Sequence, residues 1–439
     1  ALDAAKDGQT VELIKDVAEN VVIAEGKNVV LDLGGFKLAA PLTDGANKTS
    51  TITVKGSLVL KDSTATDAPV VNPDGSITYV SGSVVCPKLT VKPYARPVIV
   101  EPGGSFTLES GRLYAEDSDG VFVGTAGAEA GGSMVMKGGL IDAQEYGIGV
   151  ISHSSLIVEG GLVRARNNAA VAGNGAVSPS QGDTNIAIKG GLLRSESTSS
   201  SYIACGVYHP QAGTLTVTGG KIEAVGGVGI LMRAGSANIT GGEVVASGSM
   251  SGYVGDSKVE KVPSSGIVVD RAANYGASTE DDVVNVSGSA MIKADKGQDA
   301  LSTVLDENDS KKGLIAVSGG ELSSKPDLEY CADGYGPVQQ PDGSFGVSTE
   351  QSYTVKHLFE AVDSDEYVVD ESLAPVETLT GTIGRPTEAE PVNVKGFTAQ
   401  PVEQKTIAAD GSTIVEVRYD RTRHAVSFDS RGGSAATEQ

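Results

Sequence analysis

The sequence predicts an all-β protein whose larger part is a right-handed parallel β-helix with three short strands in each coil. Three features indicate this fold: a repeated turn motif centred on Gly-Gly, apolar residues at every second position beside it, and a further short strand that usually opens with Gly. The chain has 57 glycines and no Trp, which favours a core of Val, Ile, Leu and Ala enclosed by tight turns.

The turn motif recurs in segments such as MVMKGGLIDA, LIVEGGLVRA and IAIKGGLLRS. The aligned segments begin at Phe106, Met134, Leu156, Ile186, Leu215, Ala237 and Ile315, with a looser copy at Val284. Between them lie short strands that open at Gly120, Gly147, Gly206, Gly229 and Gly266. One such unit cannot bury its inner face alone, so the repeat predicts coils that stack into a continuous core.

Alternation assigns the two sides of each strand. In LIVEGGLVRA it predicts that Leu156, Val158, Val163 and Ala165 point inward, and that Ile157, Leu162 and Arg164 point outward. Stacking at about 4.8 Å then aligns equivalent outward residues in ladders. The first ladder is Thr107, Val135, Ile157, Ala187 and Thr216; the second is Leu140, Leu162 and Leu192; the third is Asp142, Arg164, Arg194 and Glu223.

The second and third ladders supply the candidate binding residues. Stacked leucines on an outer face need a cover, for which the inserts 172–184 and 195–204 are the nearest candidates; without a cover they are a partner-binding face. The charged ladder can also be interpreted in two ways. Its opposed charges can pair with one another, or they can form a polar stripe that faces a saccharide.

The repeat also sets the expected domain limits. Residues 1–62 read as the start of the same solenoid, 63–104 as a long loop or irregular coil, and 330–348 as the ragged end of the helix. We therefore expect a β-helix domain over 1–349. The period changes after residue 350, which predicts a small β-rich module over 350–422 and the truncated start of another β repeat over 423–439.

The order YTVKH (353–357), LTGTIG (379–384), GFTAQ (396–400) and DGSTIVEVRYDR (410–421) resembles the mucin-binding-protein-like repeat of Gram-positive cell-wall proteins. The segment HAVSFDSRGGSA (424–435) resembles the opening of a Listeria–Bacteroides (internalin B-type) repeat, and the solenoid is similar to pectate-lyase-like β-helices in its coil pattern. The first resemblance implies a β-grasp-like module in a wall-anchored extracellular protein, and a host or environmental glycan or glycoprotein, mucin included, as the ligand.

Composition restricts the partners. The formal net charge is −22, so the chain repels nucleic acid and anionic membrane surfaces, and no stretch approaches the roughly 20 apolar residues of a membrane helix. The first residues contain no basic-then-apolar run, and we expect a fragment without its export signal and anchor. We expect a monomer.

An enzyme is the main alternative, since β-helices often act on polysaccharides. Glycosidases need paired carboxylates, and the pair Asp281–Asp282 lies in an acidic loop that we expect to be solvated. We expect no cofactor and no catalytic residue; calcium is considered only at the acidic loops 117–120 and 305–310. Arg96 is expected to be structural. His209 is expected to pack in an ordinary loop, with a position on the helix surface near Tyr208 as the alternative. The sequence favours a non-enzymatic surface adhesin or stalk, with a polysaccharide lyase or hydrolase and a passive spacer as alternatives.

Overall fold

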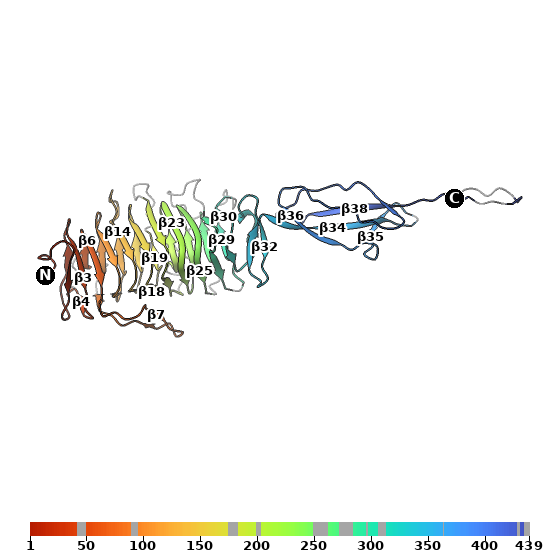
Figure 1. The fold of residues 1–439 in the computed structure, drawn as a ribbon. Helices are drawn as coiled ribbons and strands as arrows, with labels where there is room; N and C mark the ends of the chain where they lie inside the picture. Colours follow the sequence, from red (N-terminus) through yellow and green to blue (C-terminus); the bar gives the residue numbers. More distant parts are fainter. Residues whose placement is uncertain are drawn as a thin grey trace. The chain divides into compact units, whose positions relative to one another are not determined.

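The protein is all-β, with long parallel sheets that are consistent with a β-helix (Figure 1). The computed structural model describes all residues except 42–49, 89–94, 174–182, 199–202, 249–261, 272–283, 296, 306–312, 363, 428–430 and 434–439. The described residues form two compact units, 1–332 with 339–347, and 333–338 with 348–439. We call the first unit the solenoid and the second unit the module. The predicted boundary at 349/350 lies two residues beyond this division.

The strands of the solenoid form three stacks, and each strand pairs in parallel with its equivalent in the next coil. The first stack contains β1 (Gln9–Glu12), β3 (Asn28–Asp32), β6 (Ser57–Lys61), β11 (Ser105–Leu108), β14 (Ser133–Met136), β17 (Ser155–Val158), β20 (Thr184–Ile188), the first parts of β23 (Gly213–Ala224) and β25 (Ser236–Ala246), β27 (Val284–Val286) and β30 (Ile315–Val317). The second contains β4 (Lys37–Ala39), β9 (Ser83–Cys86), β12 (Arg112–Ala115), β15 (Leu140–Ala143), β18 (Leu162–Ala165), β21 (Leu192–Ser195), the later parts of β23 and β25, β28 (Met291–Ala294) and β31 (Glu321–Leu322). The third contains β2 (Val21–Ile23), β5 (Ser50–Val54), β10 (Arg96–Val100), β13 (Val121–Val123), β16 (Ile148–Val150), β19 (Val171–Ala172), β22 (Cys205–His209), β24 (Val228–Met232), β26 (Ile267–Asp270) and β29 (Leu301–Val304).

The register of these strands confirms the three predicted ladders. In the first stack, Val135 pairs with Ile157 and Ile157 with Ala187. In the second stack, Leu140 pairs with Leu162 and Leu162 with Leu192, while the charged ladder runs from Asp142 to Glu223 in consecutive coils. Equivalent side chains therefore repeat at the spacing of neighbouring strands, about 4.8 Å.

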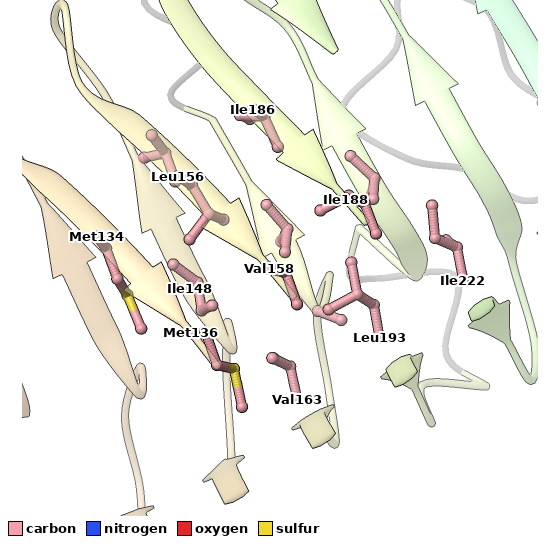
Figure 2. Close-up of a cluster of buried hydrophobic side chains, with 14 of the residues drawn as sticks. Met134, Met136, Ile148, Leu156, Val158, Val163, Ile186, Ile188, Leu193 and Ile222 are labelled. Atoms are coloured by element: carbon pink, nitrogen blue, oxygen red, sulfur yellow. The ribbon is translucent and has the colours of Figure 1, made fainter. Parts of the chain in front are cut away.

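The inward side chains form one continuous aliphatic core (Figure 2). The predicted inward residues Leu156, Val158, Val163 and Ala165 are at most 1% exposed, and Ile157 on the outer side is half-buried. At the corner between the first two stacks, Gly161 has φ +85°, and a Cβ there would lie 2.7 Å from the carbonyl oxygen of Gly139 in the preceding coil. Glycine recurs at this corner because both the left-handed backbone and the close stacking exclude a side chain.

The prediction of an irregular coil over 63–104 is wrong in part. β9 and β10 lie in this range and belong to the second and third stacks. The insert 63–82, with its small antiparallel pair β7 (Val70–Val71) and β8 (Ile77–Thr78), leaves the coil pattern. The carboxylate of Asp62 accepts hydrogen bonds from the backbone N–H groups of Thr64 and Gly82, so it holds both ends of the insert together. The sequence did not predict these regular strands because the insert interrupts the repeat between β6 and β9.

The last coil is closed by other elements. β33 (Phe345–Ser348) pairs antiparallel with β31, and Tyr330 of the 3-10 helix η2 (Leu328–Tyr330) is 3% exposed in the core. Phe345 and Val347 also pack against the core, so apolar side chains cover its C-terminal end. The strand β32 (Gly336–Gln339) lies between η2 and β33 in the sequence.

The module contains a five-stranded mixed sheet, and the apolar side chains on one face of this sheet form the core of the module. β34 (Glu350–Glu360) pairs in parallel with β38 (Ile414–Arg421) and antiparallel with β35 (Tyr367–Val369) and β36 (Glu377–Thr382), while β37 (Phe397–Ala399) pairs antiparallel with β38. The described residues of the module contain no α-helix, so the β-grasp-like class stays an expectation. Residues 422–427 are irregular, and most of the predicted further repeat lies outside the described residues.

Candidate functional site

The leucine ladder is largely inaccessible. Leu140 and Leu162 are each 1% exposed, and Leu192 is half-buried. They point away from the inner core, as alternation requires, and none of them belongs to its cluster. The alternative of an accessible partner-binding face is therefore wrong for Leu140 and Leu162, because a partner cannot reach them. Most of the two inserts proposed as their cover falls at 174–182 and 199–202, outside the described residues.

The charged ladder begins at a buried carboxylate on β15. Asp142 is 1% exposed, and it pairs with Arg112 of the preceding coil and with Arg166 of the following coil, the latter at 2.5 Å. The guanidinium group of Arg112 also lies over the ring of Tyr114, 4.5 Å from its centroid. Two cations thus neutralise one carboxylate, which offsets the cost of its burial.

The ladder continues through β18, β21 and β23 as alternating charges. Glu196 accepts from Arg164 at 2.8 Å and from Arg194 at 3.1 Å, and Arg194 also pairs with Glu223. Lys221 then bridges Glu223 at 3.4 Å and Glu243 at 3.8 Å.

A last cation, Lys293 on β28, lies 3.1 Å from Glu243. The charges of the ladder therefore pair with one another, as the first of the two alternatives states. We call the whole set the outer-face network: Arg112, Tyr114, Asp142, Arg164, Arg166, Arg194, Glu196, Lys221, Glu223, Glu243 and Lys293.

Exposure along the network shows which groups remain available. The side chains of Arg112, Lys221 and Lys293 are 37%, 39% and 38% exposed, whereas Arg164 and Arg194 are 18% and 19% exposed. Guanidinium groups held in a fixed plane by carboxylates still present donors to a ligand, and planar donors beside carboxylate acceptors suit hydroxyl-rich or acidic groups. The arrangement is a row of paired, partly exposed charges along the second stack.

A second buried layer on the outer side of the third stack was missed by the sequence analysis. Cys205, Tyr208, Leu231 and Val268 are at most 2% exposed and form a cluster apart from the inner core. The sequence contains a signal for this layer. In GILM and GIVV, apolar residues occupy both the inward and the outward positions, which is typical of strands buried on both faces.

This layer contains a fully buried ion pair. The Arg233 Nε atom lies 3.0 Å from Asp270, and its Nη1 atom donates to the Tyr208 hydroxyl at 2.9 Å. The side chains of Arg233 and Asp270 are 0% exposed. Such a pair must be matched and hydrogen-bonded to be tolerated, so we assign it a structural role.

His209 is the last residue of β22 and is buried, so the expected loop packing and the alternative of a surface position are both wrong. His209 pairs with the core residue Met232, is 0% exposed and points to the opposite side from Tyr208. Its Nδ1 atom lies 3.0 Å from the carbonyl oxygen of Ala234, so Nδ1 carries the proton, and Nε2 has no hydrogen-bond partner in the described part of the chain. Burial lowers the pKa of His209, because the charged imidazolium is disfavoured there.

The other sequence candidates are separate from the network. In the loop 117–120, Asp119 pairs with Arg96 at 2.7 Å, and Arg96 lies over the ring of Phe122, so the carboxylate is already engaged. Asp281 and Asp282, and residues 306–310 of the other acidic loop, lie outside the described residues. The three cysteines form no disulfide, and burial raises the pKa of Cys86 to about 11.

Within the described ranges, no group of three or more His, Cys, Asp or Glu side chains is placed to hold a metal ion. In that same part of the chain, no helix has the length and apolar character that crossing a membrane requires. Comparison with known proteins finds no matching family model, no matching curated protein and no matching solved structure.

Proposed function

We propose that this chain is a non-enzymatic stalk or adhesin of a bacterial cell surface, which binds a host or environmental glycan or glycoprotein along the outer-face network. The observation that carries the proposal is the register of that network. Its charged side chains repeat from coil to coil on one side of the second stack, from Arg112 to Lys293. A repeating polar surface suits an extended polymer better than a small molecule.

We infer a right-handed β-helix, a β-grasp-like module related to mucin-binding repeats, and a wall-anchored extracellular location for the protein that contains this chain. The sequence motifs at 353–357, 379–384 and 410–421 support the module, and the GG corners support the helix. The net charge of −22 supports a partner other than nucleic acid.

A panel of immobilised mucin O-glycans, other host glycans and pectins tests this proposal, with binding and product release measured on the same samples. We expect saturable binding of at least one glycan without turnover. Reproducible cleavage would replace the proposal with the polysaccharide-active enzyme. The absence of any glycan or glycoprotein ligand for the intact protein would leave the passive spacer.

A further inference from the structure

The outer face of the first stack has a regular chemical pattern that the outer-face network does not include. Strands β6, β11, β14 and β17 are consecutive in this stack, and their outward residues form three rows. We call the whole set the first-stack face: a hydroxyl row of Ser57, Ser105, Ser133 and Ser155, a middle row of Val59, Thr107, Val135 and Ile157, and a charged row of Lys61, Glu109, Lys137 and Glu159. All of these side chains are half-exposed or exposed.

The hydroxyl row and the middle row are available for a contact. Within the described residues, the hydroxyl groups of Ser57, Ser105 and Ser155 make no hydrogen bond, and that of Ser133 donates at 3.5 Å to the carbonyl oxygen of Gly104. The middle row beside them is a strip of mostly β-branched aliphatic side chains on one face of a sheet. Such a strip can pack against a second sheet, because sheets stack face to face at about 10 Å.

The charged row alternates in sign from one coil to the next. Each of its members follows the register of the strands below it, so Lys61, Glu109, Lys137 and Glu159 succeed one another along the stack. The Lys137 ammonium group lies 3.2 Å from the Glu109 carboxylate, and the two side chains are 51% and 40% exposed. An ion pair this exposed contributes little to folding, so the charges remain available to another molecule.

This order of charges makes the first-stack face complementary to itself. A two-fold axis in the plane of the contact, parallel to the strands and between β11 and β14, reverses the order of the coils in a second copy. β11 then lies opposite β14, and β6 lies opposite β17. Glu109 of one copy therefore faces Lys137 of the other, and Lys61 faces Glu159. In the same arrangement the hydroxyl rows face each other, and so do the middle rows.

We propose that the first-stack face is a dimerisation surface whose partner is a second copy of this chain, related by that two-fold axis. The contact is independent of the proposed glycan binding, which uses the second stack, and the dimer differs from the monomer expected from the sequence. The observation that selects a second copy is the charge order, since it places each exposed charge of the four strands opposite one of the other sign.

The size of the face limits the strength of the dimer. The coils from β3 to β20, with strands of three to five residues, give roughly 1,000 Å² of buried surface in total, which is at the low end of specific interfaces. We expect a dissociation constant on the order of 10 µM, so the chain is a monomer at submicromolar concentration.

Sedimentation velocity over chain concentrations from about 0.5 to 200 µM tests the proposal, and the wild-type mass should rise from monomer to dimer. Lys137→Glu places Glu opposite Glu, and Glu109→Lys places Lys opposite Lys. Each single variant should therefore dimerise at least about tenfold more weakly. Arg418→Glu is the control, because this exposed cation lies in the module, and it should leave the dissociation constant unchanged.

A mixing experiment distinguishes a contact between copies from an effect within one chain. In an equimolar mixture of the Lys137→Glu and Glu109→Lys chains, two acidic side chains of one copy face two basic side chains of the other, so a heterodimer should form with about the wild-type affinity. Far-UV circular dichroism checks that both variants are folded. A wild-type chain that stays monomeric throughout, a dimer that survives both charge reversals, or a mixture that stays monomeric would each overturn the proposal.

Discussion

At the residue scale, alternation decides which side chains the solenoid buries. Val158 is 1% exposed in the aliphatic core, while its neighbour Ile157 faces outward on the same strand. We predict that Val158→Asp unfolds the solenoid, because an unpaired charge in this core costs several kcal/mol. Ile157→Asp is the matched control and should change the unfolding midpoint little. Unchanged thermal unfolding of Val158→Asp would show that the inward assignment is wrong.

His209 gives a prediction about pH. Its pKa in the folded state is lowered by burial, and the unfolded state has the ordinary value of about 6.5. As pH falls below about 6.5, the unfolded state therefore takes up a proton that the folded state does not, and the free energy of unfolding decreases by up to about 1.4 kcal/mol per pH unit until the folded pKa is reached.

The His209→Met substitution should remove this contribution, since Met232 already occupies the equivalent place in the next coil. Denaturant unfolding at about pH 7.5 and pH 5 measures it, and the wild-type protein should lose more stability than the variant. The same pH dependence in both proteins would mean that His209 titrates equally in the folded and unfolded states.

At the scale of the element, the outer layer of the third stack depends on the ion pair between Arg233, directly after β24, and Asp270, the last residue of β26. Removal of one partner leaves a buried charge, so Asp270→Ala should destabilise the solenoid by about 3–5 kcal/mol. The double variant Arg233→Met with Asp270→Leu should recover most of the loss, because apolar residues then replace both charges. Chemical denaturation of the wild-type protein, Asp270→Ala and the double variant measures the free energy of unfolding of each. A double variant no more stable than Asp270→Ala would contradict this explanation.

The ladders and the strands around them show which parts of the fold could be predicted from the sequence. The GG corners and the alternation predicted the ladders residue by residue, because Gly conformation and strand period are local properties. Alternation could not predict that Leu140 and Leu162 are each 1% exposed, because it assigns a side chain to a face of the strand and does not say what lies over that face. It also missed β9 and β10, which the insert 63–82 separates from the repeat, and Glu196, which lies just after β21 and joins Arg164 to Arg194.

At the scale of the whole molecule, the chain joins a repetitive solenoid to a module with its own core. The module core contains Tyr353, Val355 and Phe359 on β34 and Val415 and Tyr419 on β38. The solenoid is the larger unit and bears the outer-face network. We therefore propose that the solenoid binds the ligand and that the module folds around its own sheet.

The measurement that tests this account most directly is the affinity for the tightest glycan of the panel after Arg164→Ser with Arg194→Ser. The control is Lys137→Ser with Lys189→Ser, two cations in ion pairs outside the outer-face network, whose side chains are 51% and 50% exposed. We predict at least about tenfold weaker binding, about 1.4 kcal/mol, for the arginine variant and little change for the control, with both proteins folded by circular dichroism. Unchanged affinity of the arginine variant, or an equal loss in both variants, would contradict the assignment of binding to the outer-face network.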